Sequence, residues 1–207
     1  MRPMPWPETL QRIVADYRSN DIVRAREVLW WRADGCSFAE MLDRVGYART
    51  EKDQRHPHQR RLGRGALEAG AAALRARSAD LQRAGDFFSV FRLVEDAFAP
   101  IRGLGELAVY DAADRICLRL GHEPTLIYLH AGTRAGARRL RGGRLAREEA
   151  WAMHHRQLPE GLLGLSNREA EDVLCIYKDV LLTPPDRLEG VRRRRLPCLG
   201  DMPTSSC

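Results

Sequence analysis

A short glycine turn between two helical segments constrains this chain more than any other feature of its sequence. Gly103-Leu104-Gly105 follows Pro100 and opens a run, residues 106–120, in which apolar side chains recur at spacings of three and four. This spacing predicts a helix with one buried face. Glycine suits the turn because it adopts positive φ and allows another backbone to approach closely. The chain therefore has to reverse here between two packed helices.

The segment before the turn is rich in aromatic residues and also has helical spacing. Its apolar residues are Phe87, Phe88, Phe91, Leu93, Val94 and Phe98. Pro100 ends this helix, because proline disfavours the helical conformation in the residue before it. The sequence therefore predicts a helix, a tight glycine turn and a second helix, in that order.

This pattern resembles the helix-hairpin-helix motif of DNA-binding proteins, and residues 87–140 loosely resemble the superfamily of helix-hairpin-helix DNA glycosylases. Segments 121–124 and 128–134 occupy places comparable to the loop and the polar segment that follow the motif in that family. Leu107 stands where bifunctional members carry a Schiff-base lysine, and residues 128–134 contain no aspartate. The resemblance implies binding of backbone phosphates, whereas the family's catalytic lysine and aspartate are missing.

Two elements are candidates for phosphate binding. At the turn, backbone N–H groups near Gly103 and Gly105, with Arg102 beside them, can bind an anion at the start of a helix. A second element, residues 130–139, combines small residues at a spacing of four with several arginines. The candidate contacts in this element are His130, Gly132, Arg134, Arg138 and Arg139. Both elements have an alternative that needs no ligand, since glycines also allow two helices to pack closely.

The charge composition favours a nucleic acid as partner. The chain has 34 Lys plus Arg against 28 Asp plus Glu, and only Lys52 and Lys178 are lysines. Arginine binds phosphate in a bidentate manner and stacks on bases. A GC-rich coding sequence would produce the same bias without selection for binding. The densest basic run, Arg192–Arg195, lies in residues 191–207, which we expect to be disordered and to add salt-dependent affinity.

Few residues are candidates for catalysis. Tyr110 and Asp111 follow the turn closely, and they would face the pocket of a flipped base with the carboxylate as a general base or a charge stabiliser. Asp111 and Arg115 are also four residues apart, which is typical of an ion pair within one helix. His130 is the third candidate, because it lies where the glycosylase-like family keeps polar site residues.

Nothing in the sequence predicts a metal ion or another cofactor. His56-Pro57-His58 lies in a basic loop, residues 49–64, and the proline between the histidines favours a loop over a metal site. This loop clamps a phosphate backbone, or it is simply solvated, or its His58 and Gln59 are structural residues that bond to a neighbouring helix. The five cysteines are scattered and fit neither a disulfide framework nor a zinc ribbon. Cys117 and Cys175 lie in apolar surroundings and are expected to be buried thiols.

The remaining segments predict further helices. We expect helices at residues 7–18, from about 20 to 34, 37–45, 66–83, 147–157 and 166–182. The run 126–129 is strand-like, with an extended link or the start of a helix as alternatives. Ser37 with Glu40, and Ser166 with Glu169, match capping boxes. The fold class is therefore all-α, with one compact multi-helix domain over residues 1–190 that contains a helix-hairpin-helix-like unit at about 87–140.

These observations predict a cytoplasmic protein that binds nucleic acid. The expected partner is DNA, contacted at its backbone phosphates by the Gly-Leu-Gly turn and by arginines. No apolar run approaches the ~20 residues that span a bilayer, and the N-terminus lacks the apolar core of a secretory signal. The alternatives are a DNA-processing enzyme with a glycosylase-like fold and a non-standard active site, and a helical scaffold for protein interactions.

Overall fold

The computed structural model describes residues 6–19, 21–33, 35–56 and 59–190. The fold of these residues is mostly helical, which confirms the all-α prediction. The α-helices are α1 (Pro7–Ser19), α2 (Asp21–Arg32), α3 (Phe38–Gly46), α4 (Arg64–Ala76), α5 (Ser78–Arg83), α6 (Phe87–Phe98), α7 (Glu106–Leu120), α8 (Ala131–Leu140) and α9 (Asn167–Ile176). The Arg192–Arg195 run and the predicted tail lie outside the described residues, as does His58.

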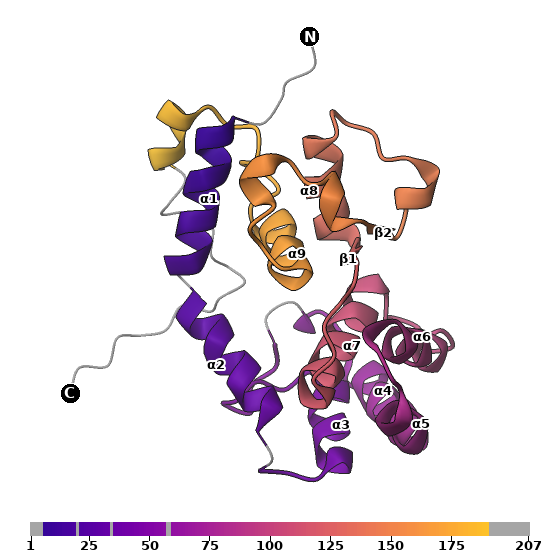
Figure 1. The fold of residues 1–207 in the computed structure, drawn as a ribbon. Helices are drawn as coiled ribbons and strands as arrows, with labels where there is room; N and C mark the ends of the chain where they lie inside the picture. The colour runs from indigo at the N-terminus through magenta and orange to yellow at the C-terminus, as the bar shows by residue number, and fades with distance from the viewer. Residues whose placement is uncertain (1–5, 20, 34, 57–58, 191–207) are drawn as a thin grey trace, which may run out of the picture.

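The helices form two groups, each with its own hydrophobic cluster (Figure 1). The first helical group is α2–α7, and its cluster runs from Trp31 to Tyr128. The second helical group is α1, α8 and α9, and its cluster joins Leu10 near the N-terminus to Leu181 near the end of the described chain. Among the described residues, no helix is both long enough and apolar enough to cross a bilayer.

The helix, turn and helix predicted around Gly103 are present with the expected bounds. The Asp86 side chain accepts a hydrogen bond from the Ser89 N–H and caps the start of α6. Gly103 has a φ of +102°, which explains why glycine stands there. The Leu104 side chain points inward, and its Cδ1 would lie 3.1 Å from a Cβ at Gly70 in α4. The turn is therefore pinned to the first cluster.

A short strand joins the two groups. β1 (Ile127–Tyr128) pairs antiparallel with β2 (Ala152–Met153), which confirms the strand-like run at 126–129. Successive side chains of a strand point to opposite faces. Tyr128 accordingly belongs to the first cluster, whereas Ile127 and Leu129 belong to the second.

Three predicted helices differ from the structure. The predicted helix 147–157 is wrong: two 3-10 turns flank β2 there, because this backbone pairs with β1 and the Leu129 N–H donates to the Trp151 carbonyl. The helix predicted over 66–83 breaks at Arg77, between α4 and α5. The helix predicted over 166–182 ends at Ile176. Both predicted capping boxes are confirmed.

Candidate functional site

A buried polar cluster lies at the start of α8, where it faces α9. His130 is the residue before α8, and its Nε2 lies 2.5 Å from Oε1 of Glu171 in α9. The Thr133 hydroxyl donates to the same Glu171 oxygen at 2.6 Å and lies 2.8 Å from His130 Nε2. The side chains of His130 and Glu171 are only 4% and 5% exposed. The imidazole is therefore held by a carboxylate inside the protein.

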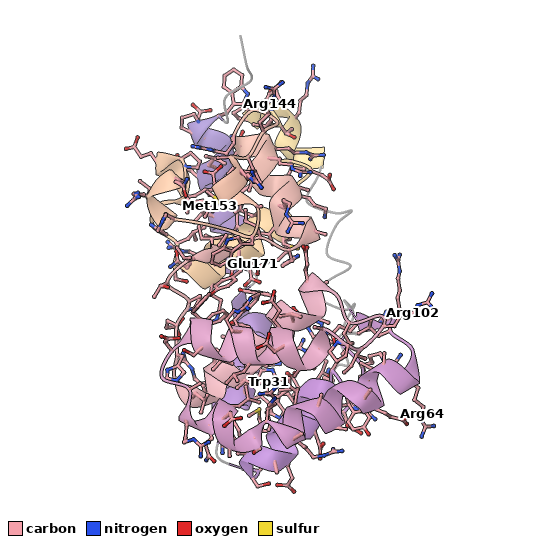
Figure 2. The ribbon with its side chains drawn as sticks, turned by 90° about the vertical axis from the view of Figure 1, so that its right-hand side faces the viewer. Trp31, Arg64, Arg102, Arg144, Met153 and Glu171 are labelled. Carbon is pink, nitrogen blue, oxygen red and sulfur yellow. The ribbon has the colours of Figure 1, made fainter. Side chains whose placement is uncertain are left out.

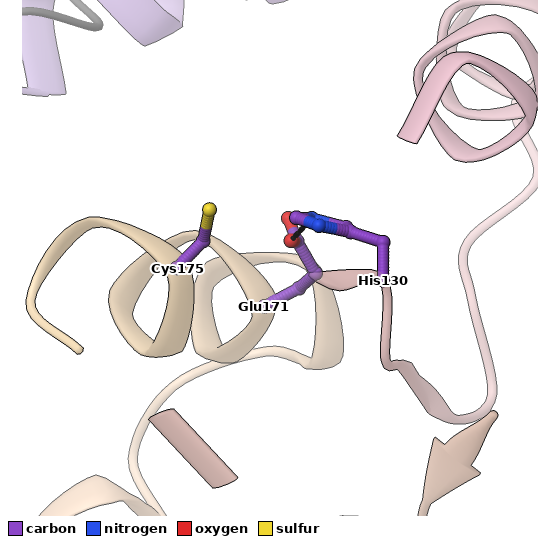
Figure 3. Close-up of side chains that lie close together, drawn as sticks. All are labelled: His130, Glu171 and Cys175. Carbon is purple, nitrogen blue, oxygen red and sulfur yellow. Dashed lines mark hydrogen bonds and ion pairs between the residues drawn. The ribbon is translucent and has the colours of Figure 1, made fainter. Parts of the chain in front are cut away.

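Cys175, one helical turn after Glu171, lies near both of these side chains (Figure 3), and it is half-buried rather than buried as predicted. Donor atoms of His130, Glu171 and Cys175 all lie within 4.8 Å of one another. The Nδ1 atom of His130 is buried, and no described group forms a hydrogen bond with it. An unpaired buried nitrogen costs free energy, because most buried polar atoms in proteins have a hydrogen-bond partner.

A small cavity, which we call the junction cavity, lies between this cluster and α7. Its volume is about 50 Å³, and its wall includes the three predicted catalytic residues, Tyr110, Asp111 and His130. The Tyr110 and His130 rings have centroids 5.7 Å apart. Asp111 accepts a hydrogen bond from Gln59 Nε2 at 3.0 Å and lies 3.6 Å from Arg115, as the four-residue spacing predicts. The fold thus brings the three candidates together, although no substrate contact tests their role.

A second and larger space, which we call the aromatic cavity, opens beside the glycine turn. Its volume is about 540 Å³. Gly105, Glu106 and Arg134 contribute to its wall, and Tyr110 and His130 separate it from the junction cavity. Its aromatic side chains are Phe88, Phe91, Tyr110, Tyr128 and Trp151. Burial raises the pKa of the Tyr128 phenol, so this side chain is neutral at neutral pH.

Two of the predicted phosphate-binding arginines form internal ion pairs. Arg134 contacts both carboxylate oxygens of Glu106 at 3.0 Å and donates to the Leu129 carbonyl at 2.6 Å. Arg139 lies 3.0 Å from Asp179. These contacts join α8 to α7, β1 and the segment after α9. Arg134 and Arg139 consequently have a structural role, whatever else they bind.

The other predicted contacts divide between the turn and α8. Arg102, Gly103 and Gly105 are exposed together at the turn, and Figure 2 shows Arg102 extending away from the ribbon. Arg138 is exposed in the last turn of α8. Gly132 is half-buried, and a Cβ there would be 2.7 Å from Cys175 Sγ. The structure therefore groups three of the predicted residues at the turn and places Gly132 in the buried cluster.

Sequence reasoning did not single out Glu171 and Thr133. One signal was present: Glu171 and Cys175 are four residues apart on one face of α9, and Thr133 in the first turn of α8 follows the N-cap residue His130 by three. That α8 and α9 face each other depends on their packing. No sequence pattern links residues 130 and 171 directly.

Comparisons with protein-family models, with curated proteins and with solved structures give no match for this chain. The resemblance to helix-hairpin-helix proteins therefore stays a prediction, and the observed order of α6, glycine turn and α7 motivates it.

Proposed function

We propose that this protein binds nucleic acid, with DNA as the expected partner, at the glycine turn and the neighbouring aromatic cavity. The observation that carries the proposal is the aromatic cavity of about 540 Å³ whose wall includes Gly105 of the turn. A space of this size lies in the range of small-ligand sites. Aromatic side chains bind unstacked bases by stacking, with little dependence on sequence.

Charge at the turn supports phosphate binding. Glu106 lies in the first turn of α7, where its carboxylate alone would oppose an anion. Arg134 pairs with both oxygens of this carboxylate and offsets its charge. Arg102 and the exposed backbone around Gly103 and Gly105 then set the local potential. A DNA strand whose phosphates contact the glycine turn could place one of its bases in the aromatic cavity.

Fluorescence anisotropy with intact, abasic-analogue and single-stranded oligonucleotides over a salt series tests this function. We expect salt-dependent binding that favours the two substrates with accessible bases. Arg102→Ala should weaken binding to all three and lower the slope of log K against log salt by about one. Trp151→Ala should weaken single-strand binding by about 5- to 150-fold, the range for losing one base-stacking contact.

Arg77→Ala is the matched control for the arginine variant. Arg77 is also exposed, but it lies far from the glycine turn. It follows the C-terminal end of α4, whereas Ala66, at the N-terminal end of α4, is the residue that faces Gly103. At 1.5 Å per residue, Arg77 lies about 16 Å from Ala66 along the helix. Its substitution should leave affinity unchanged. Absence of binding at low salt would overturn the proposal and favour a scaffold for protein interactions.

A further inference from the structure

We propose that His130, Glu171 and Cys175 form a binding site for a zinc ion. The three residues supply an imidazole nitrogen, a carboxylate oxygen and a thiolate sulfur, which are the ligand types that zinc binds in proteins. This site lies in the buried cluster between α8 and α9, and it does not depend on nucleic-acid binding.

The donor atoms fit a tetrahedral ion bound to His130 Nδ1 once the Glu171 carboxylate rotates away from Nε2, the atom that it contacts in the structure. Zinc–ligand bonds of 2.0–2.3 Å place neighbouring ligand atoms about 3.5 Å apart. The donor atoms already lie within 4.8 Å of one another. Backbone rearrangement is not needed, because Glu171 and Cys175 share one face of α9 and His130 directly precedes α8.

The imidazole of His130 and the thiol of Cys175 both lie next to Gly132. A Cβ built on Gly132 would lie 2.7 Å from Cys175 Sγ and 3.7 Å from His130 Nδ1. Glycine therefore leaves the space through which these two atoms approach each other. The Nδ1 atom has no hydrogen-bond partner among the described groups, although it is buried. An ion between sulfur and nitrogen would satisfy it.

The surrounding residues support a cation. Thr133 donates to Glu171 Oε1, and such a hydrogen bond fixes a ligating carboxylate in the manner of metal sites. The residues around the junction cavity include five carboxylates but one guanidinium, that of Arg115, and Arg168 outside the wall pairs with one of these carboxylates, Asp114. The five carboxylates belong to Glu27, Asp111, Asp114, Glu171 and Asp172. The excess of negative charge favours a divalent ion.

The junction cavity also provides room for a fourth ligand. Its volume of about 50 Å³ exceeds the roughly 10–15 Å³ that one water needs. Three protein ligands with one open position are typical of catalytic zinc sites. Binding of the ion displaces the Cys175 thiol proton to solvent.

Metal titration of the untagged, full-length protein tests the site. After treatment with a chelator, the protein is titrated with Zn²⁺ by calorimetry and with Co²⁺ by absorption. We expect one ion per chain, a thiolate-to-cobalt charge-transfer band, and a rise in Tm with zinc. Cys175→Ser should abolish the band and weaken zinc affinity at least tenfold. Glu171→Gln should weaken affinity while the band is retained.

Cys36→Ser is the matched control for the cysteine variant. Cys36 is a half-buried thiol as well, but it packs against the first cluster. Burial raises the pKa of the Cys117 thiol, which keeps that residue protonated and unsuited to bind the ion. His58→Gln controls for binding at His56-Pro57-His58. Both controls should retain the band, and the metal-free form of each variant should match the wild type in circular dichroism.

Two results would overturn the proposal. One is wild-type protein that shows no cobalt band and no zinc-dependent change in Tm. The other is a band that survives Cys175→Ser, or one that disappears in Cys36→Ser or His58→Gln, because the ion would then be bound elsewhere.

Discussion

The two helical groups are built from different parts of the chain and from different side chains. The first cluster uses one continuous stretch, residues 31–128, and buries aromatic rings of Trp31, Phe87, Phe98, Tyr110 and Tyr128. The second cluster combines residues 10–17 with residues 127–181, and Tyr17 is its one fully buried aromatic residue. Neighbouring segments can thus form the first group locally, whereas the second group requires both ends of the described chain.

Each group contains one helix crossing at which backbone lies directly on backbone, but other contacts of the first group are made by rings. In the first group, a Cβ at Gly46 of α3 would lie 2.3 Å from the Ala71 Cα atom of α4. In α8, a Cβ at Gly136 would lie 2.2 Å from the Leu174 carbonyl oxygen of α9. Here backbone rests on backbone, with no side chain between. By contrast, α6 and β1 meet through rings, and Phe87 and Tyr128 have centroids 4.9 Å apart. Aromatic contacts can adjust by small rotations, but a backbone contact cannot.

One buried ion pair links the groups, and breaking it should have the largest effect. Arg168 of α9 donates through Nε to Asp114 of α7 at 2.6 Å, and their side chains are 8% and 5% exposed. Burial lowers the pKa of Arg168, but Asp114 and Glu123 raise it more, so the guanidinium stays charged. Asp114→Ala should therefore lower the free energy of unfolding by about 3–5 kcal/mol.

Urea denaturation and calorimetry measure this effect and test the coupling of the two groups. In the wild type we expect one transition, as for a single domain. In Asp114→Ala the transition should broaden or divide, since each group keeps its own cluster. The control is Asp114→Ala combined with Arg168→Met, which removes the uncompensated charge and should recover part of the loss. No recovery would show that the pair does not act through its charge.

A smaller effect is expected where α8 crosses α9. Gly136→Ala should destabilise the second group by about 1–3 kcal/mol, because the added methyl group forces two backbones apart. Gly164→Ala is the control, since a Cβ at Gly164 meets nothing within 4 Å. It should change stability by no more than about 0.5 kcal/mol. Equal effects in urea denaturation would contradict the backbone-contact explanation.

The smallest effect concerns the cap of α6 in the first group. Hydrogen bonds from Ser89 lower the pKa of Asp86. Because the folded pKa lies below the unfolded value, this contribution to stability is present above about pH 4 and is lost as the pH falls through the folded pKa. Asp86→Asn keeps a capping oxygen without the charge. Its Tm should fall less than that of the wild type on acidification, as measured by circular dichroism between pH 6 and 3; identical pH profiles would contradict this role.

Local signals in the sequence predicted most helix positions. The aromatic segment ended by Pro100 and the apolar spacing of residues 106–120 predicted α6 and α7, and Ser166 with Glu169 predicted the start of α9. The prediction of a helix at 147–157 was wrong because residues 152–153 of this segment form β2 and pair with β1, which is distant in the sequence. Helical propensity does not reveal such pairing, since the competing hydrogen bonds come from elsewhere in the chain.

The sequence by itself determined the all-α character, the glycine turn with its positive φ at Gly103, and His130 as a residue of interest. Only the tertiary structure decided that His130 lies against Glu171 and that Arg134 pairs with Glu106. The physical reason is the separation in sequence between the residues that interact. Caps, turns and apolar spacing depend on residues within a few positions of one another, whereas the buried cluster exists because two glycines allow α8 to approach α9 across some forty residues of chain.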